Sequence, residues 1–130
     1  MSHAAYAQTA ACTSFQHTVT VTISSANGAA TVSQDPACVA RGGKMSWTAT
    51  EGDSWSADFT DDSHSPFASG KKHHGAKVAK TSGDKVKACS KSDSSYDAAA
   101  GGCVFKFKAT HVKGGKSWIL DPQVVVQPGT

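Results

Sequence analysis

The chain has 130 residues, a formal net charge of +3 at pH 7, and only 18% charged residues. This length suits a single domain with one core. The longest apolar stretch, residues 119–126, is interrupted by Asp121 and Pro122 and is far shorter than the roughly 18 residues of a membrane-spanning helix. The sequence therefore predicts no transmembrane segment, and the small net charge argues against nucleic acid as a partner.

The first predicted element is a β-hairpin. Residues 15–23 alternate apolar and polar side chains and are rich in Val, Ile and Thr, which is typical of a half-buried strand. Asn27-Gly28 follows, a pair that tolerates the positive φ angles of a tight hairpin turn. Residues 30–33 supply the second strand, and Asp35-Pro36 ends it, since proline cannot donate to a ladder.

Two further strands are predicted in the middle of the chain. Gly42-Gly43 opens a strand over residues 44–50, and the same alternation continues over residues 55–59. Trp47 and Trp55 both fall on the apolar faces of these strands, so we expect them in the core. Residues 61–70 form a loop in which Phe67 is expected to return to the core.

The second half of the chain has one strong strand and several weaker ones. Val78 and Val86 lie in short runs separated by Ser82-Gly83-Asp84, which indicates a second hairpin. Residues 90–102 are predicted to be a loop, residues 104–112 a clear strand and residues 119–127 the last one. The whole pattern predicts an all-β sandwich of about seven or eight strands over residues 15–130, preceded by an N-terminal segment, residues 1–14.

The four cysteines are even in number and widely spaced, which favours disulfides over a zinc knuckle or a redox motif. Folding the first hairpin brings Cys12 near Cys38, while Cys89 and Cys103 flank one polar loop. We therefore favour Cys12–Cys38 and Cys89–Cys103, although the crossed pairings stay open. Disulfides place the protein outside the cytoplasm, in a periplasm or the extracellular space.

Three short segments carry a resemblance to a known group of proteins. They are Gly-Gly-Lys-Met-Ser-Trp at 42–47, Phe-Lys-Phe-Lys at 105–108 and Leu-Asp-Pro-Gln-Val-Val-Val at 120–126. In this arrangement the chain resembles small bacterial secreted cupredoxin-like and immunoglobulin-like sandwiches over most of residues 15–128. Copper-binding cupredoxins carry a late Cys, then a His and a Met. Here His111 lies eight residues after Cys103 and no Met follows, so the resemblance implies the fold without the blue-copper centre.

Histidines suggest one hypothesis for a site. His64, His73 and His74 are close in sequence, and three imidazoles meeting at one rim can hold Cu(II) or Zn(II). Adjacent histidines in a regular strand point to opposite faces, so this site requires an irregular loop. The alternative interpretation is that all three are solvated loop residues. His111 is expected in its strand near the sheet surface.

Lysines and aromatics suggest a second hypothesis. Seven lysines lie between residues 71 and 91 against the single Asp84, and such a stretch attracts acidic polysaccharides, envelope components or acidic proteins. Alternatively, these lysines protect an edge strand from pairing with other chains. Trp118 and Tyr96 lie in loop-like surroundings that suggest exposure. The candidate partner-binding residues are Lys71, Lys72, Lys77, Lys80, Lys85, Lys87, Trp118 and Tyr96.

Signals for catalysis are weak. Asp61-Asp62-Ser63-His64 contains an acid, a hydroxyl and an imidazole, but consecutive residues rarely supply the geometry of a catalytic triad. We therefore predict a non-enzymatic, secreted or periplasmic binding module without a cofactor, which engages an anionic polymer or a protein through a Lys-rich hairpin. The alternatives are a copper- or zinc-binding protein that uses the loop histidines and a structural module of the cell envelope.

Overall fold

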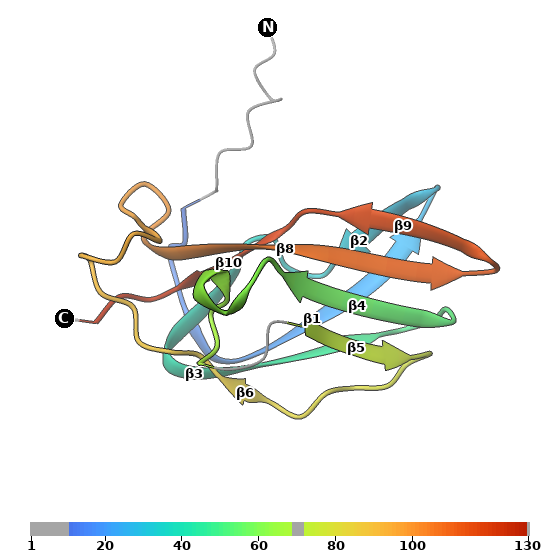
Figure 1. Cartoon of the computed structure of the whole chain (residues 1–130), viewed down its shortest axis with the longest axis horizontal. Helices are drawn as coiled ribbons and strands as arrows, with labels where there is room; N and C mark the ends of the chain where they lie inside the picture. The colour runs from blue at the N-terminus through green and yellow to red at the C-terminus, as the bar shows by residue number, and fades with distance from the viewer. Residues whose placement is uncertain (1–10, 69–71, 130) are drawn as a thin grey trace, which may run out of the picture.

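The computed structural model of the protein describes residues 11–68 and 72–129. Within these residues the chain forms ten β-strands and one short 3-10 helix, Asp62–His64 (Figure 1). The strands are β1 (Gln16–Ala26), β2 (Ala29–Val32), β3 (Ala37–Ala49), β4 (Ser54–Phe59), β5 (Lys72–Ala76), β6 (Asp84–Lys85), β7 (Tyr96–Asp97), β8 (Gly102–Lys113), β9 (Lys116–Leu120) and β10 (Gln123–Val126). The prediction of an all-β protein is confirmed. The described part of the chain has no helix that is long and apolar enough to cross a membrane.

The strands form one mixed open sheet. Its main order is β2-β1-β3-β10-β8-β4-β5, with β6 beside β3, and β7 and β9 beside β8. Both β1 and β10 run parallel to β3, and the remaining pairs are antiparallel. The hairpin predicted at Asn27-Gly28 is confirmed, because both residues have positive φ angles and β1 pairs with β2 around them.

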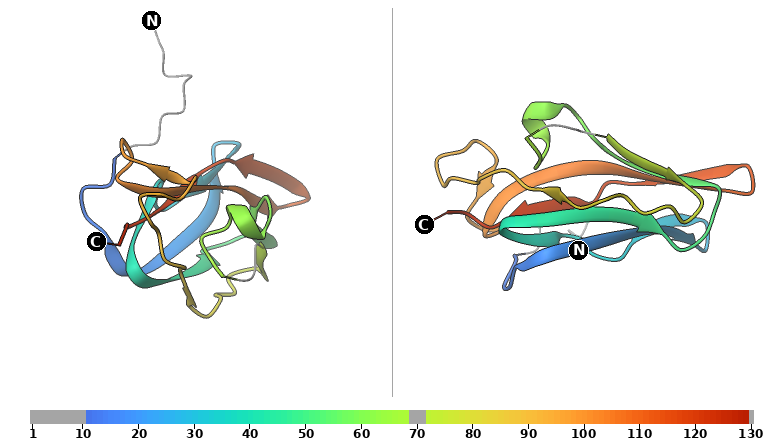
Figure 2. Two further views of the ribbon diagram at one scale, coloured as in Figure 1. Left: turned by 60° about the vertical axis from the view of Figure 1, so that its left-hand side comes forward. Right: turned by 90° about the horizontal axis from the view of Figure 1, so that it is seen from below.

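One long strand bends this sheet over the core. The first part of β8, residues 103–106, pairs with β10, and its later part, residues 107–112, pairs with β4. The sheet is thereby folded, with β1 and β3 in one layer and β4 and β8 in the other (Figure 2). Apolar side chains from all four strands and from β10 fill the space between the layers as one cluster, and burying them supplies the main driving force for folding.

Aromatic rings form the centre of the core. Trp47, on β3, is fully buried and makes edge contacts with Phe59 and Phe107, at centroid distances of 6.1 and 5.0 Å. Phe67 follows the 3-10 helix and returns to the cluster, where it is also buried. The inward positions predicted for Trp47, Trp55 and Phe67 are thus confirmed.

Three strand predictions need correction. Strand β3 begins at Ala37, and Gly42-Gly43 lie inside it, where the register against β1 shifts. A Cβ at Gly43 would lie 2.8 Å from the Ala40 carbonyl oxygen, so the glycines form an irregularity in a long strand and do not open a short one. The expected last strand is two strands, β9 and β10, which are separated by Asp121-Pro122.

The third correction concerns the predicted second hairpin. Val78 is 56% exposed and lies outside any strand. Residues 77–86 instead run along β3 as an irregular segment, held by the backbone bonds Thr81 N–H to Trp47 C=O and Val86 N–H to Gly43 C=O. Only Asp84–Lys85 within this segment forms a short strand, β6, beside β3.

The two ends of the sheet are built differently. At the turn end, tight turns join β1 to β2, β3 to β4, and β8 to β9 (right side of Figure 1). At the loop end lie the 3-10 helix, residues 86–101 and the C-terminal residues (left side of Figure 1). Both disulfides are at the loop end, and they join Cys12 to Cys38 and Cys89 to Cys103. These are the two local pairs that the sequence favours, and the prediction is confirmed.

Candidate functional site

The three histidines of the metal hypothesis do not converge. His73 and His74 lie next to each other on β5 and face opposite sides of it, with His73 buried and His74 exposed. His64 lies in the 3-10 helix, and its Nδ1 is 2.7 Å from Oδ1 of Asp61. Because β5 is a regular strand paired with β4, the irregular loop that a shared site requires is not formed. The structure therefore gives no support to a common metal ion on His64, His73 and His74.

His73 lies in an aromatic environment. Its ring stacks on Trp47 at 5.4 Å and contacts Phe67 at 4.9 Å between centroids. Nδ1 lies 3.5 Å from Oδ2 of Asp84, while the buried Nε2 has no hydrogen-bond partner among the described atoms. Burial lowers the pKa of His73 below its ordinary value of 6.5; the Asp84 carboxylate partly opposes this shift, and His74 lowers the pKa further. The neutral imidazole is therefore the favoured form here.

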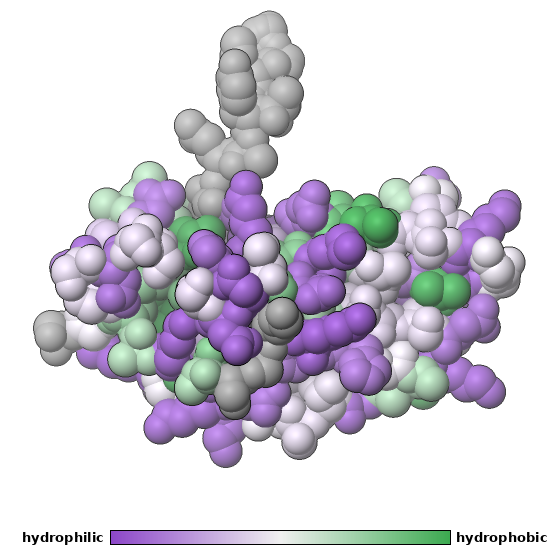
Figure 3. Space-filling view, viewed as in Figure 1, coloured by the Kyte–Doolittle hydropathy of each residue, from purple (hydrophilic) through white to green (hydrophobic). Residues whose placement is uncertain are grey.

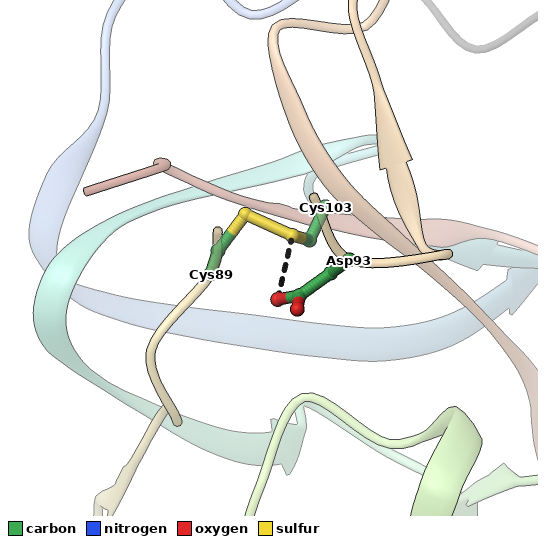
Figure 4. A group of neighbouring side chains, drawn as sticks. All are labelled: Cys89, Asp93 and Cys103. Atoms are coloured by element: carbon green, nitrogen blue, oxygen red, sulfur yellow. Dashed lines mark hydrogen bonds between the residues drawn. A yellow bond between two sulfur atoms is a disulfide. The ribbon is translucent and has the colours of Figure 1, made fainter. Parts of the chain in front are cut away.

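One other group of potential ligands lies close together. Within the described residues, Cys89, Asp93 and Cys103 form the one set of three whose ligand atoms all lie within 4.8 Å of one another. Figure 4 shows Asp93 pointing at the Cys89–Cys103 disulfide, with Oδ2 3.9 Å from Sγ of Cys103. Thiolates are the form of cysteine that binds metals, and both sulfurs are bonded to each other. In its oxidised form this group is therefore a structural clamp.

The sequence places His111 near the sheet surface, and this prediction is wrong. The structure shows that His111 is fully buried. Its Nε2 lies 2.7 Å from the Glu51 carbonyl oxygen, which only accepts, so Nε2–H is the donor. In the neutral ring Nδ1 then accepts from the Ser25 hydroxyl at 2.8 Å. His111 thus joins β1, β8 and the turn between β3 and β4, and it acts as a structural residue.

The Asp-Asp-Ser-His motif also has a structural role. Oδ1 of Asp61 accepts from the backbone N–H groups of Ser63 and His64, both at 3.0 Å, and so caps the 3-10 helix. The Ser63 hydroxyl donates to the same oxygen at 2.6 Å. The bond from the Ser63 hydroxyl contributes most, followed by the bond with the His64 side chain, and they lower the pKa of Asp61 to about 2. A triad needs the serine on the imidazole nitrogen opposite the acid, and this arrangement differs.

Lysines gather along one side of the molecule. We define the lysine edge as the exposed residues Lys44, Lys72, Lys77, Lys80 and Lys85, which lie on β3, on β5 and on the segment from 77 to 85. The contact between His73 and Asp84 shows that β5 and β6 lie side by side. Hydrophilic side chains predominate on the face that carries both strands (Figure 3). Lys71 is outside the described residues.

The other predicted partner-binding residues lie elsewhere. Trp118 is half-buried on β9, opposite His111 of β8, on the far side of β8 from β4 and β5. Tyr96 and Lys87 lie at the loop end, together with His64. The structure therefore divides the predicted set among the lysine edge, β9 and the loop end.

The loop end contains a wide hollow on the described surface. This loop-end groove has a volume of about 1240 Å³ and lies between the 3-10 helix and residues 87–97, with β8 as its floor. Its lining residues are Thr60, Ser63, His64, Lys87, Ala88, Asp93, Ser94, Ser95, Tyr96, Asp97, Val104, Phe105 and Lys106. Sequence reasoning singled out Lys87, Tyr96 and His64 separately. It missed the groove, although a polar loop between two predicted disulfide partners was a usable signal.

No family model, curated protein or solved structure matches the chain. The function therefore has to be argued from the geometry of these surfaces.

Proposed function

We propose that the protein is a non-catalytic, extracytoplasmic binding module that engages an anionic polymer through the lysine edge. The observation that carries this proposal is the pairing of Lys44 with Lys85, which lie directly opposite each other on β3 and β6. Like charges in this position destabilise a strand pair. A bound polyanion would neutralise Lys44 and Lys85, which explains why two lysines occupy these opposite positions.

The charges around this pair support the same conclusion. Lys72, Lys77 and Lys80 are exposed along the same edge. Asp84, the one acidic residue on the segment between 72 and 87, directs its carboxylate to His73. Lysines that are not neutralised by neighbouring carboxylates raise the local concentration of a polyanion and speed its association.

The compartment and the fold class belong to this proposal as well. Two disulfides form and persist in oxidising compartments, which supports a periplasmic or extracellular location. The folded all-β sheet supports the expectation of an immunoglobulin-like or cupredoxin-like sandwich. Ligands of such a module in that location include acidic polysaccharides of the cell envelope.

The test is a titration of the oxidised protein with polygalacturonate, a linear polyanion, over a series of salt concentrations. We expect binding that weakens with salt and that falls by about tenfold or more in the variant Lys72→Gln/Lys77→Gln/Lys80→Gln/Lys85→Gln. A matched control removes four positive charges elsewhere: Lys91→Gln/Lys108→Gln/Lys113→Gln/Lys116→Gln. If both variants lose the same affinity, only net charge matters and the proposal is wrong.

The same variants separate binding from protection of the sheet edge. Strand β5 is at the end of the main strand order, and lysines on such an edge hinder pairing with other chains. Should the lysine-edge variant self-associate in analytical ultracentrifugation while it binds polygalacturonate unchanged, protection is the role of these lysines and the binding proposal fails.

A further inference from the structure

The loop-end groove has walls that are fixed by short-range bonds. Cys89–Cys103 ties the start of one wall to β8. In the same wall, the Asp93 carboxylate accepts from Ser90 N–H at 2.8 Å and the Asp97 carboxylate accepts from Ala99 N–H at 2.9 Å. The opposite wall is the 3-10 helix capped by Asp61. A groove with fixed walls loses little conformational entropy when a ligand binds.

Lys87 connects the two walls. Its ammonium group lies 5.6 Å from the centroid of the Phe105 ring, within the range of a cation–π contact. The same Nζ donates to the Asp62 carbonyl oxygen at 3.5 Å. Lys106, on the exposed side of β8, adds a second ammonium group to the lining. The lining therefore includes two ammonium groups, and the contacts with Phe105 and Asp62 hold that of Lys87 in place.

The rest of the lining offers an aromatic ring, hydroxyl groups and carboxylates. Tyr96 packs partly against the core and lines the groove, so its ring has a defined position. On either side of it are the hydroxyls of Ser94 and Ser95 and the carboxylates of Asp93 and Asp97. Each carboxylate has a second oxygen that is able to accept a ligand hydroxyl.

We propose that the loop-end groove binds a short acidic oligosaccharide, such as a chain of uronic acids. Sugar carboxylates would pair with Lys87 and Lys106, in charge-assisted hydrogen bonds. Sugar hydroxyls would donate to Asp93 and Asp97, and an apolar ring face would lie on Tyr96. The volume, about 1240 Å³, exceeds that of a typical small-molecule pocket, roughly 300–1,000 Å³, and suits several linked sugar rings.

This site goes beyond the proposed role of the lysine edge. The lysine edge attracts any polyanion by charge alone, whereas the groove selects by carboxylate, hydroxyl and ring together. None of the lysines of the lysine edge lines the groove. The two proposals can therefore be tested separately, because a ligand too short to follow the lysine edge tests the groove alone.

The experiment titrates the oxidised, full chain with tetragalacturonate by calorimetry and follows the backbone amides by NMR. The matched ligand is methyl-esterified tetragalacturonate, which has the same rings without the charges. We expect chemical-shift changes at Lys87, Tyr96 and Lys106, and at least about tenfold weaker binding of the ester. Equal affinity for acid and ester, or shifts confined to the lysine edge, would overturn the proposal, as would no binding.

Variants that remove lysines inside and outside the groove show which charges bind the ligand. Lys87→Gln/Lys106→Gln should weaken tetragalacturonate binding by about tenfold or more. Lys108→Gln/Lys116→Gln removes the same charge outside the groove and should change it less than about twofold. Replacing Lys87 also removes its contact with Phe105. The single variant Lys106→Gln avoids this problem, because Lys106 is exposed and its replacement leaves the packing unchanged. If Lys106→Gln and Lys108→Gln behave alike, the groove is not the site.

Discussion

The turn end and the loop end of this sheet are ordered by different means. At the turn end, residues 51–53 bond to their neighbours without a covalent link: Asp53 N–H donates to the Val112 carbonyl at 2.7 Å, and Asp53 Oδ2 accepts from Gly114 N–H at 2.9 Å. At the loop end, longer connections are held by two disulfides. Tight turns leave little space for a ligand, whereas cross-linked loops enclose a groove. If the groove binds a ligand as proposed, the loop end serves recognition and the turn end only closes the sheet.

The largest expected effect comes from removing the cross-link at the groove. Cys89→Ala/Cys103→Ala releases a loop with a sequence separation of 14, and we expect the free energy of unfolding to fall by about 3 kcal/mol. Urea denaturation measures this change. The loop-end amides should also lose protection from hydrogen exchange more than those of the turn end. Uniform loss of protection at both ends would contradict the division between them.

The next largest effect concerns His111 at the turn end. His111→Phe keeps a ring of similar size but removes both hydrogen bonds, to Ser25 and to the Glu51 carbonyl. We expect a loss of about 2–3 kcal/mol in the free energy of unfolding. Ser25→Ala, which removes only the bond at Nδ1, should cost about 1 kcal/mol. If the two variants are equally stable, His111 does not hold this end together.

Gly52 gives a smaller test of the same end. Its φ angle is +104°, and a Cβ there would collide with the imidazole of His111. Gly52→Ala is therefore expected to cost about 2 kcal/mol. Gly28→Ala is the control, since φ is also positive there, +77°, but nothing lies within 4 Å of the added Cβ. Thermal unfolding should rank Gly52→Ala below Gly28→Ala, and the reverse order would exclude the contact with His111.

The smallest effect is a pH dependence that comes from neither end but from His73. Burial lowers the pKa of the folded His73 below 6.5, so the unfolded chain binds a proton that the folded chain does not. The free energy of unfolding should then decrease as the pH falls below about 6.5. Two neighbouring groups modify this shift: Asp84, whose carboxylate contacts the imidazole, opposes it, and His74, on the opposite face of β5, adds to it.

His73→Phe should remove this part of the pH dependence and also the unpartnered Nε2. The matched control variant is His17→Phe, the same change at an exposed position of β1. Urea denaturation at a series of pH values measures the slope. A slope in His73→Phe equal to that of the unmodified protein would show that carboxylates, not His73, cause the acid sensitivity.

Much of the local structure follows from the sequence. Alternation marks β1, β4 and β8, and Asn27-Gly28 marks the first turn, because each depends on neighbours within a few residues. The same alternation places His111 on the apolar face with Phe105 and Phe107, so the expectation that it lies near the sheet surface is wrong although the pattern itself is right. Its partners, Ser25 and Glu51, come from distant segments, so local sequence does not indicate that its burial is satisfied.

The long-range features could not be predicted from the sequence, because they too depend on residues from distant segments. The parallel pairing of β1 with β3 depends on the rest of the sheet. The irregularity at Gly42-Gly43 looks like a strand start when its neighbours are not known. In the same way, the groove combines residues 60–64, 87–97 and 104–106, and the polar loop between Cys89 and Cys103 indicates only one of its walls.

The position of β10 has a consequence for how the chain folds. β10 lies between β3 and β8, and all four of its residues are buried. Val124 pairs with Ala37, a partner from the first third of the chain. The middle of the sheet therefore cannot assemble while residues 123–126 are still on the ribosome. Such distant pairing makes folding slow, and the facing edges of β3 and β8 stay unpaired until β10 has joined both of them.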